Sequence, residues 1–121
     1  KKTDIYLVNS FGQTQSFFKE CKIVFLGGSI VEHGGQNPLE AAKYGCQILH
    51  GINIWNFKEI YNLLKIHKVS NKITTTNQLY HKVDQLLNNK KKSKNLQLKI
   101  KNLGHNILNL TLNELNFYID K

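Results

Sequence analysis

Residues 27–40 read G-G-S-I-V-E-H-G-G-Q-N-P-L-E and follow directly on the apolar run Ile23–Leu26. The apolar run predicts a buried strand. Asn37-Pro38 predicts a helix start, because Asn is a favoured N-cap and Pro suits the first helical position. Glycines let the backbone approach a ligand closely, and the N–H groups at a helix start are unpaired. This order of strand, glycine-rich turn and helix therefore predicts an anion-binding site.

The flanking sequence alternates short apolar runs with helical patterns. Further strands are predicted at 5–8 and 47–49, with a weak one at 69–74, and helices at 14–22, 39–44, 57–67, from 76 or 77 onward, and about 95–119. Asn56 is predicted to cap the helix that begins at Phe57. Short apolar strands that alternate with helices are typical of a parallel sheet covered on both faces. The predicted fold class is therefore α/β, with a Rossmann-like sheet and helices on both faces.

Two loops are predicted at the same edge of this sheet. Phe11-Gly12-Gln13 follows the strand at 5–8, and the glycine-rich stretch follows Ile23–Leu26. Ligands of open α/β sheets bind beyond the carboxyl ends of the strands. We therefore expect the two loops to converge on one small-ligand site.

The length of 121 residues fits one domain or part of one. The chain begins at Lys1 and contains no methionine, so we expect a piece of a longer protein. No apolar run approaches the roughly 18 residues that span a bilayer, and we expect the piece itself to be soluble. Cys21 and Cys46 lack a metal or redox spacing and are predicted to be buried free thiols in a reducing compartment.

The formal net charge is +9, and all seventeen basic residues are lysine. Recognition of phosphates and bases in nucleic acids depends heavily on the bidentate Arg fork, which this chain lacks. An acidic ligand or an anionic membrane surface is therefore favoured over nucleic acid as the partner. The run Lys90–Lys94 is predicted to be a solvated loop, with contact to anionic lipid as the alternative.

Residues 24–42 resemble the C-terminal domain of 3-deoxy-D-manno-octulosonic acid (Kdo) transferases, whose signature is G-G-S followed by G-G-H-N-P-L-E. Residues 4–12 are similar to the family's strand and T-M-G-E turn, and residues 56–60, N-F-K-E-I, to its N-F-x-[DE]-I helix start. The resemblance covers roughly the first 65 residues. It implies the C-terminal half of a GT-B glycosyltransferase, in which two Rossmann-like halves face each other across a cleft. Such enzymes move Kdo from CMP-Kdo to a lipid A precursor at the cytoplasmic face of the bacterial inner membrane.

The resemblance also implies roles for individual residues. The implied nucleotide-binding residues are Phe11, Gly12, Gln13, Asn37, Pro38, Leu39 and Glu40, supported by a loop that contains Gly27, Gly28, Ser29, Gly34, Gly35 and Gln36. Glu40 would accept the ribose hydroxyls of CMP, or alternatively close a capping box on the Asn37 N–H. Ser29 would donate to a phosphate or to the Kdo carboxylate. Asn56 is a possible further member beside the cleft.

The chain departs from the family signature at two positions. Gln13 stands where the family has Glu, and Gln36 where it has His, so a charge and an acid–base group are lost. We expect no metal and no cofactor, and no catalytic residue within this chain. The general base, the acceptor site and the membrane anchor are expected in an N-terminal half, on which the helix at about 95–119 would pack.

Two alternatives to this interpretation stay open. One is another GT-B transferase that uses a different nucleotide sugar. The other is a basic module without enzymatic activity that binds nucleic acid or a membrane surface. Whichever holds, we expect the chain alone to have no transferase activity.

Overall fold

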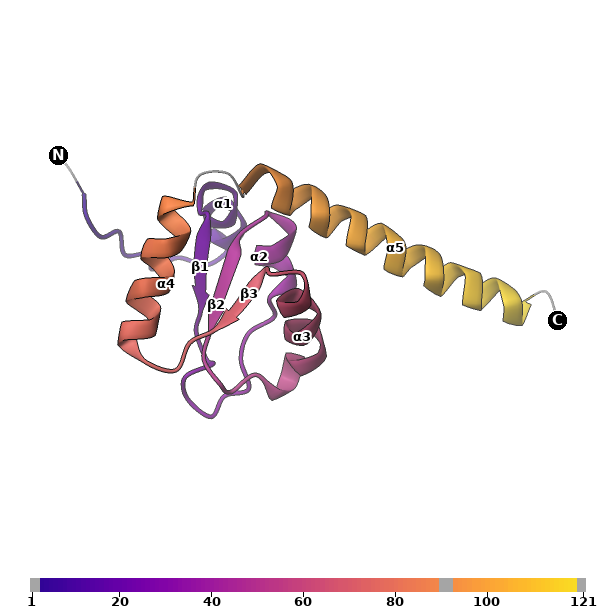
Figure 1. Cartoon of the computed structure of the whole chain (residues 1–121), viewed down its shortest axis with the longest axis horizontal. Coiled ribbons are helices and arrows are strands. Elements are labelled where there is room, and N and C mark those ends of the chain that lie inside the picture. The colour runs from indigo at the N-terminus through magenta and orange to yellow at the C-terminus, as the bar shows by residue number, and fades with distance from the viewer. Residues whose placement is uncertain (1–2, 90–92, 120–121) are drawn as a thin grey trace.

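The computed structural model describes residues 3–89 and 93–119, with the backbone alone at 93–95. Its centre is a parallel sheet of the order β1-β2-β3, formed by Ile23–Leu26, Gln47–His50 and Ser70–Lys72 (Figure 1). The register pairs Val24 with Ile48 and Ile48 with Ser70. All three strands run in one direction, so the connections that follow their carboxyl ends lie at one edge of the sheet.

Helices connect the strands and extend beyond them. They are α1 (Thr14–Glu20), α2 (Leu39–Lys43), α3 (Lys58–Ile66), α4 (Thr76–Asn88) and α5 (Ser93–Ile119), with a 3₁₀ turn, η1 (Trp55–Phe57), before α3. In Figure 1, α4 lies on one side of the sheet and α2 and α3 lie on the other. The predicted α/β class, with a parallel sheet and helices on both faces, is confirmed.

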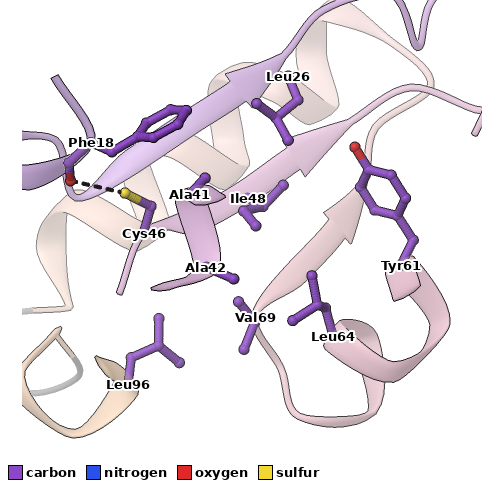
Figure 2. Packing of buried hydrophobic residues seen from close by; sticks show 10 residues of the cluster. All are labelled: Phe18, Leu26, Ala41, Ala42, Cys46, Ile48, Tyr61, Leu64, Val69 and Leu96. Carbon is purple, nitrogen blue, oxygen red and sulfur yellow. Dashed lines mark hydrogen bonds between the residues drawn. The ribbon is translucent and has the colours of Figure 1, made fainter. Parts of the chain in front are cut away.

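The main core lies between the sheet and the α2–α3 side. Its buried cluster is Phe18, Leu26, Ala41, Ala42, Cys46, Ile48, Tyr61, Leu64, Val69 and Leu96, drawn in Figure 2. Ile48, at the centre of β2, is completely buried, and alanines at 41 and 42 let α2 approach it closely. Full burial of one aliphatic side chain stabilises the fold by about 1.5–3 kcal/mol, so this cluster fixes α2 and α3 against the sheet.

The opposite face of the sheet is covered more loosely. Phe25 and Leu49 face α4 across a hollow of about 600 Å³, whose other wall includes Leu79, Val83 and Leu87. No described side chain of α4 is fully buried. The apolar stripe predicted for this helix therefore faces the sheet without forming a second tight core.

The strand predicted at 5–8 is wrong. The apolar side chains of Ile5, Tyr6 and Leu7 are exposed, and no described strand pairs with this segment. The segment contacts α1 through the ring of Tyr6, whose centroid lies 6.3 Å from that of Phe17. A short apolar run becomes a strand only when a neighbour supplies hydrogen bonds, and that partner is not a local property of the sequence.

The two cysteines differ in their surroundings. Both thiols are free, as predicted, but Cys21 is exposed, so its predicted burial is wrong. Cys46 is buried, and its Sγ lies 3.3 Å from the Phe18 carbonyl and 3.1 Å from the Cys21 carbonyl, to which the thiol donates. Burial, together with the nearby Cys21 thiol, raises the pKa of Cys46 to about 11, which keeps it protonated.

Helix α5 extends away from the sheet (Figure 1). Its first turns are anchored, because Leu96 is 7% exposed and Ile100 packs against the core cluster. Beyond them, Ile107 and Leu110 of the predicted stripe are exposed, so packing of this helix on another half stays a prediction. Among the described residues, no helix has the length and apolarity needed to cross a membrane. Of the predicted solvated run 90–94, residues 90–92 lie outside the described residues, and α5 already begins at Ser93.

Candidate functional site

The loop after β1, residues 27–36, has three glycines with left-handed backbone. The φ angles are +67° at Gly28, +91° at Gly34 and +81° at Gly35, values that residues with a Cβ rarely adopt. The Gly35 N–H donates to the Gly28 carbonyl at 3.0 Å, which closes the loop on itself. Gly27 has no positive φ, and a Cβ there would meet nothing within 4 Å. We call residues 27–36 the glycine loop.

Ser29 has a structural role that differs from the predicted one. Its side chain is completely buried, and its Oγ donates to the Leu26 carbonyl at 2.6 Å. The same oxygen accepts the Gly51 N–H at 2.8 Å. The hydroxyl therefore has both a donor and an acceptor partner inside the protein. The predicted donation from Ser29 to a phosphate or carboxylate is wrong.

A second loop, residues 51–56 after β2, holds the glycine loop through main-chain and side-chain hydrogen bonds. The Asn53 N–H donates to the Ser29 carbonyl, and Asn53 Nδ2 to the Ile30 carbonyl, both at 2.9 Å. The Asn56 N–H donates to the Gly34 carbonyl at 3.3 Å. We call residues 51–56 the β2 loop.

Asn56 does not cap α3. It lies within η1, and the residue before α3 is Phe57, which makes no side-chain cap. The Asn56 Nδ2 donates instead to the His33 carbonyl at 3.4 Å. The predicted cap is therefore wrong, because an amide side chain that favours helix starts can equally bond the backbone of a neighbouring loop.

The close approach of the two loops explains several glycines. A Cβ at Gly34 would collide with the Asn56 side chain and would lie 2.8 Å from the indole Nε1 of Trp55. A Cβ at Gly35 would lie 3.2 Å from the Asn53 carbonyl oxygen. A Cβ at Gly51 would collide with the Ser29 backbone. The packing of one loop on the other thus explains why these positions are glycine, without any contact to a ligand.

The start of α2 has the predicted cap. Asn37 Oδ1 accepts the Leu39 N–H at 3.0 Å, as an N-cap side chain does. Pro38 has φ −83° and ψ −9°, and its carbonyl accepts the Ala42 N–H at 3.0 Å, so it occupies the first helical position although α2 is assigned from Leu39. The helix has only five residues, so its dipole is short and contributes little to the attraction of an anion.

Glu40 lies in the first turn of α2 with its side chain exposed. Among the described residues, none donates a hydrogen bond to its carboxylate, so the capping box on Asn37 is not formed. The side chain is therefore open to solvent, in the first turn of the helix that follows the glycine loop. Among the described residues, no hydrogen bond of the fold uses this charged group.

The turn Phe11-Gly12-Gln13 adopts the predicted bend. Gly12 has φ +84°, and the Gln13 carbonyl accepts the N–H groups of Ser16 and Phe17 at 3.0 and 3.3 Å, which starts α1. The side chain of Phe11 is fully exposed. No hydrogen bond within the described part of the chain joins this turn to the glycine loop or to α2. Its convergence with them on one site stays a prediction.

Sequence reasoning assigned no role at the site to two buried residues near the glycine loop. Tyr61 of α3 is 1% exposed, and its Oη donates to the Gln36 carbonyl at 2.9 Å. His50, the last residue of β2, is 4% exposed, and the centroid of its ring lies 4.3 Å from that of Tyr61. Its Nδ1 lies 2.7 Å from the Gly51 carbonyl, which only accepts, so Nδ1 carries the proton. A signal was available for His50, which ends a strand whose carboxyl end adjoins these loops, but not for the loop contact of Tyr61, which lies within α3.

The surroundings shift the ionisation of both rings. Burial lowers the pKa of His50 below its usual 6.5, and Lys72 and Lys65 lower it further, against the opposing effect of the hydrogen bond to Gly51. Burial raises the pKa of Tyr61 to about 12. Tyr61 is therefore a neutral donor, and His50 is a neutral ring at physiological pH. Neither provides a charge to the site.

A cavity of about 490 Å³ opens at the carboxyl edge of the sheet on the α4 side. Its lining includes Ile30 of the glycine loop, Ile52 of the β2 loop and the threonines that precede α4. None of the predicted nucleotide-binding residues lines it. In residues 3–89 and 93–119, no group of three or more His, Cys, Asp or Glu side chains could hold a metal ion.

Comparison with curated proteins gives consistent relatives, whereas no family model matches the chain. It is 33% identical over 97 residues to 3-deoxy-D-manno-octulosonic acid transferase of Haemophilus influenzae, covering 79% of this chain and 23% of that protein. It is 31% identical over 96 residues to a probable mitochondrial 3-deoxy-D-manno-octulosonic acid transferase of Arabidopsis thaliana, covering 74% of this chain and 21% of that protein. The Aquifex aeolicus transferase of the same name is 28% identical over 91 residues, which are 75% of this chain and 26% of that protein.

The chain thus spans about a quarter of the length of the curated relatives that it matches. The matches cover about three quarters of this chain and agree in the name of the protein. The glycine loop, the Asn37 cap and the exposed Glu40 all lie in this chain. Over the part of those relatives that it covers, the chain belongs to the 3-deoxy-D-manno-octulosonic acid transferase family.

Proposed function

We propose that this chain is the donor-binding part of a Kdo transferase and binds the nucleotide of CMP-Kdo beside the start of α2. The observation that carries the proposal is the Glu40 carboxylate. It is exposed, it is not used by the fold among the described residues, and it follows a loop that the β2 loop holds in place. The Kdo transferase relatives support the choice of donor.

In this proposal Glu40 accepts hydrogen bonds from the two ribose hydroxyls. A carboxylate has two oxygens and accepts two neighbouring O–H groups in a charge-assisted pair. Asn37, Pro38 and Leu39 present the first turn of α2 to the nucleotide. Gln36, Phe11, Gly12 and Gln13 complete the site, with Gln13 and Gln36 acting through neutral hydrogen bonds.

The whole protein is proposed to be a GT-B glycosyltransferase that transfers Kdo to a lipid A precursor at the inner membrane surface. The general base and the acceptor site belong to the other half in this proposal. The exposed apolar side chains of α5 beyond Ile100 would pack against that half. The present chain would then bind the donor nucleotide without transferring the sugar, and with no metal or cofactor.

Titration of CMP into isotopically labelled protein tests the proposal. We expect amide shift changes at Gly35, Asn37 and Glu40, and weaker binding by the Glu40→Gln variant. Loss of a charge-assisted hydrogen bond costs about 1–3 kcal/mol, or roughly a 5- to 150-fold rise in Kd.

Glu32→Gln is the matched control. It removes the same charge from an exposed position in the glycine loop and should leave the affinity for CMP unchanged. Absence of shift changes in the wild-type protein at millimolar CMP would count against the site. Preference for UMP or GMP over CMP would instead indicate a different nucleotide sugar.

A groove of about 870 Å³ between the β3 edge and α4 favours a second candidate function, binding of a polyanion. Its lining includes Lys65, Lys68, Lys72 and Lys82, together with His81, and no carboxylate. Such a module would bind duplex nucleic acid or anionic vesicles with a steep dependence on salt. Binding of this kind, unaffected by CMP and lost on replacing the four lysines, would favour this candidate.

A further inference from the structure

Tyr61 connects the core to Gln36, at the edge of the proposed nucleotide site. Its ring is buried beside His50, at the carboxyl end of β2, with the centroids 4.3 Å apart. Figure 2 shows the side chain pointing out of α3 with its oxygen at the far end from the helix. That oxygen donates to the carbonyl of Gln36 at 2.9 Å. The hydrogen bond thus joins a rigid part of the fold to the end of the glycine loop.

The Gln36 carbonyl belongs to the peptide that links Gln36 to Asn37. A hydrogen bond to this carbonyl restricts rotation of that peptide and so restricts the backbone of Asn37. The Asn37 side chain in turn accepts the Leu39 N–H, and Glu40 is the next residue. One buried donor therefore influences the direction in which the Glu40 carboxylate is presented.

The other loop contacts lie farther from α2. The β2 loop bonds carbonyls between Ser29 and Gly34, through Asn53 and Asn56. Tyr61 bonds the loop two residues later, immediately before the Asn37 cap. The β2 loop contacts reach as far as Gly34, whereas Tyr61 bonds Gln36, the residue that adjoins Asn37.

We propose that Tyr61 is a positioning residue for donor binding, whose hydroxyl fixes the Gln36 peptide and thereby the orientation of Asn37–Glu40. The inference rests on the proposed function of that site. A buried tyrosine could instead serve the stability of the core alone. The two roles differ in what happens to the loop and to nucleotide affinity when only the hydroxyl is removed.

Tyr61→Phe removes the hydroxyl and keeps the packing of the ring. Tyr44→Phe is the matched control, because its Oη also makes one side-chain hydrogen bond, to Gln15 Oε1 at 3.4 Å, on the α1 side of α2. Three quantities are measured for each variant: the urea midpoint, amide hydrogen exchange at residues 35–40 (Pro38, which has no N–H, excepted), and the Kd for CMP.

We expect faster exchange at residues 35–40 and a Kd about 3- to 10-fold higher in Tyr61→Phe, as loss of one hydrogen bond predicts. Tyr44→Phe should change neither. Exchange at residues 35–40 that stays at the wild-type rate in folded Tyr61→Phe would overturn the inference. So would a rise in Kd that is the same in both variants.

Failure of the proposed function gives a different result, namely no amide shift change with CMP in the wild-type protein. Exchange measured without nucleotide still decides whether Tyr61 orders residues 35–40. Should Tyr61→Phe fail to fold, Asn53→Ala provides a second comparison, since it releases the Ile30 carbonyl at the other end of the loop. We expect faster exchange near Ile30 with residues 36–40 unchanged; loosening of both ends together would contradict a separate role for Tyr61.

Discussion

Replacement of Gly51 by alanine tests whether the packing of the two loops stabilises the fold. A Cβ at this position would lie 2.5 Å from the Ser29 carbonyl carbon and 2.8 Å from the Ile30 nitrogen. These are backbone atoms, so no side-chain rotation can relieve the overlap. Gly51 has no positive φ, so backbone strain at residue 51 itself does not contribute. We therefore expect Gly51→Ala to destabilise the fold by forcing the glycine loop and the β2 loop apart.

The expected loss follows from the contacts that separation would break. The Gly51 N–H bonds Ser29 Oγ at 2.8 Å, and the Asn53 N–H bonds the Ser29 carbonyl at 2.9 Å. Each such bond contributes about 1 kcal/mol, and overpacking typically costs about 1–3 kcal/mol more. We expect the free energy of unfolding to fall by about 3–5 kcal/mol. That is a large share of the roughly 5–15 kcal/mol that stabilises a typical domain.

The assay is urea unfolding followed by far-UV circular dichroism. Gly27→Ala is the control, because Gly27 also has no positive φ and a Cβ there meets nothing within 4 Å. This control should change the free energy of unfolding by no more than about 0.5 kcal/mol. A loss below about 1 kcal/mol for Gly51→Ala, similar to that of the control, would refute the reasoning.

Two further predictions concern ionisable side chains. A thiol reagent should modify Cys21 readily in the folded protein and Cys46 only after unfolding, because Cys21 is exposed while Cys46 is buried with its pKa raised to about 11. Mass spectrometry of the labelled peptides measures the two labelling rates. Equal rates would contradict the prediction. The pKa of His50 is lower in the folded state than its ordinary 6.5, so the unfolded chain binds more protons at a pH just below 6.5. The free energy of unfolding should therefore fall as the pH drops from 7 toward 5. Urea midpoints across this range should depend less on pH in His50→Gln, and an unchanged dependence would show that His50 does not contribute.

The elements that the sequence predicts well are those governed by local chemistry. Asn37 and Pro38 specify a helix start through a cap and a fixed φ, and both act within a few residues. The apolar runs of β1 and β2 are short, but each is followed by glycine and flanked by helical patterns, so the parallel sheet could be predicted.

The predictions that failed depended on distant partners. Ile5–Val8 has the composition of a strand, but whether it forms one depends on a neighbour that the run itself does not specify. Ser29 and Asn56 carry groups that can bond a ligand, a helix start or another loop. Ser29 donates locally to Leu26, but the Gly51 N–H that it accepts lies 22 residues away, and the His33 carbonyl bonded by Asn56 lies 23 residues away. Residue type alone could not indicate these distant partners.

The candidate site likewise combines features that local sequence predicts with a feature that depends on a distant partner. Its start at Asn37 and the exposed Glu40 follow from the motif, whereas the support by Tyr61 does not. A tyrosine in the apolar face of a helix ordinarily indicates core packing, and here it packs in the core as well as bonding the loop. Only the folded arrangement shows that the two functions coincide in one side chain.

The packing of the glycine loop on the β2 loop also has an evolutionary consequence. A side chain can be gained at position 51 only if the backbone at position 29 withdraws, and one at position 34 only if Asn56 and Trp55 yield. Substitutions at these positions are thus not independent of one another. Among natural variants of this chain, positions 34 and 56 should covary, whereas position 51 should stay glycine, because its Cβ would meet backbone atoms that every residue at position 29 carries.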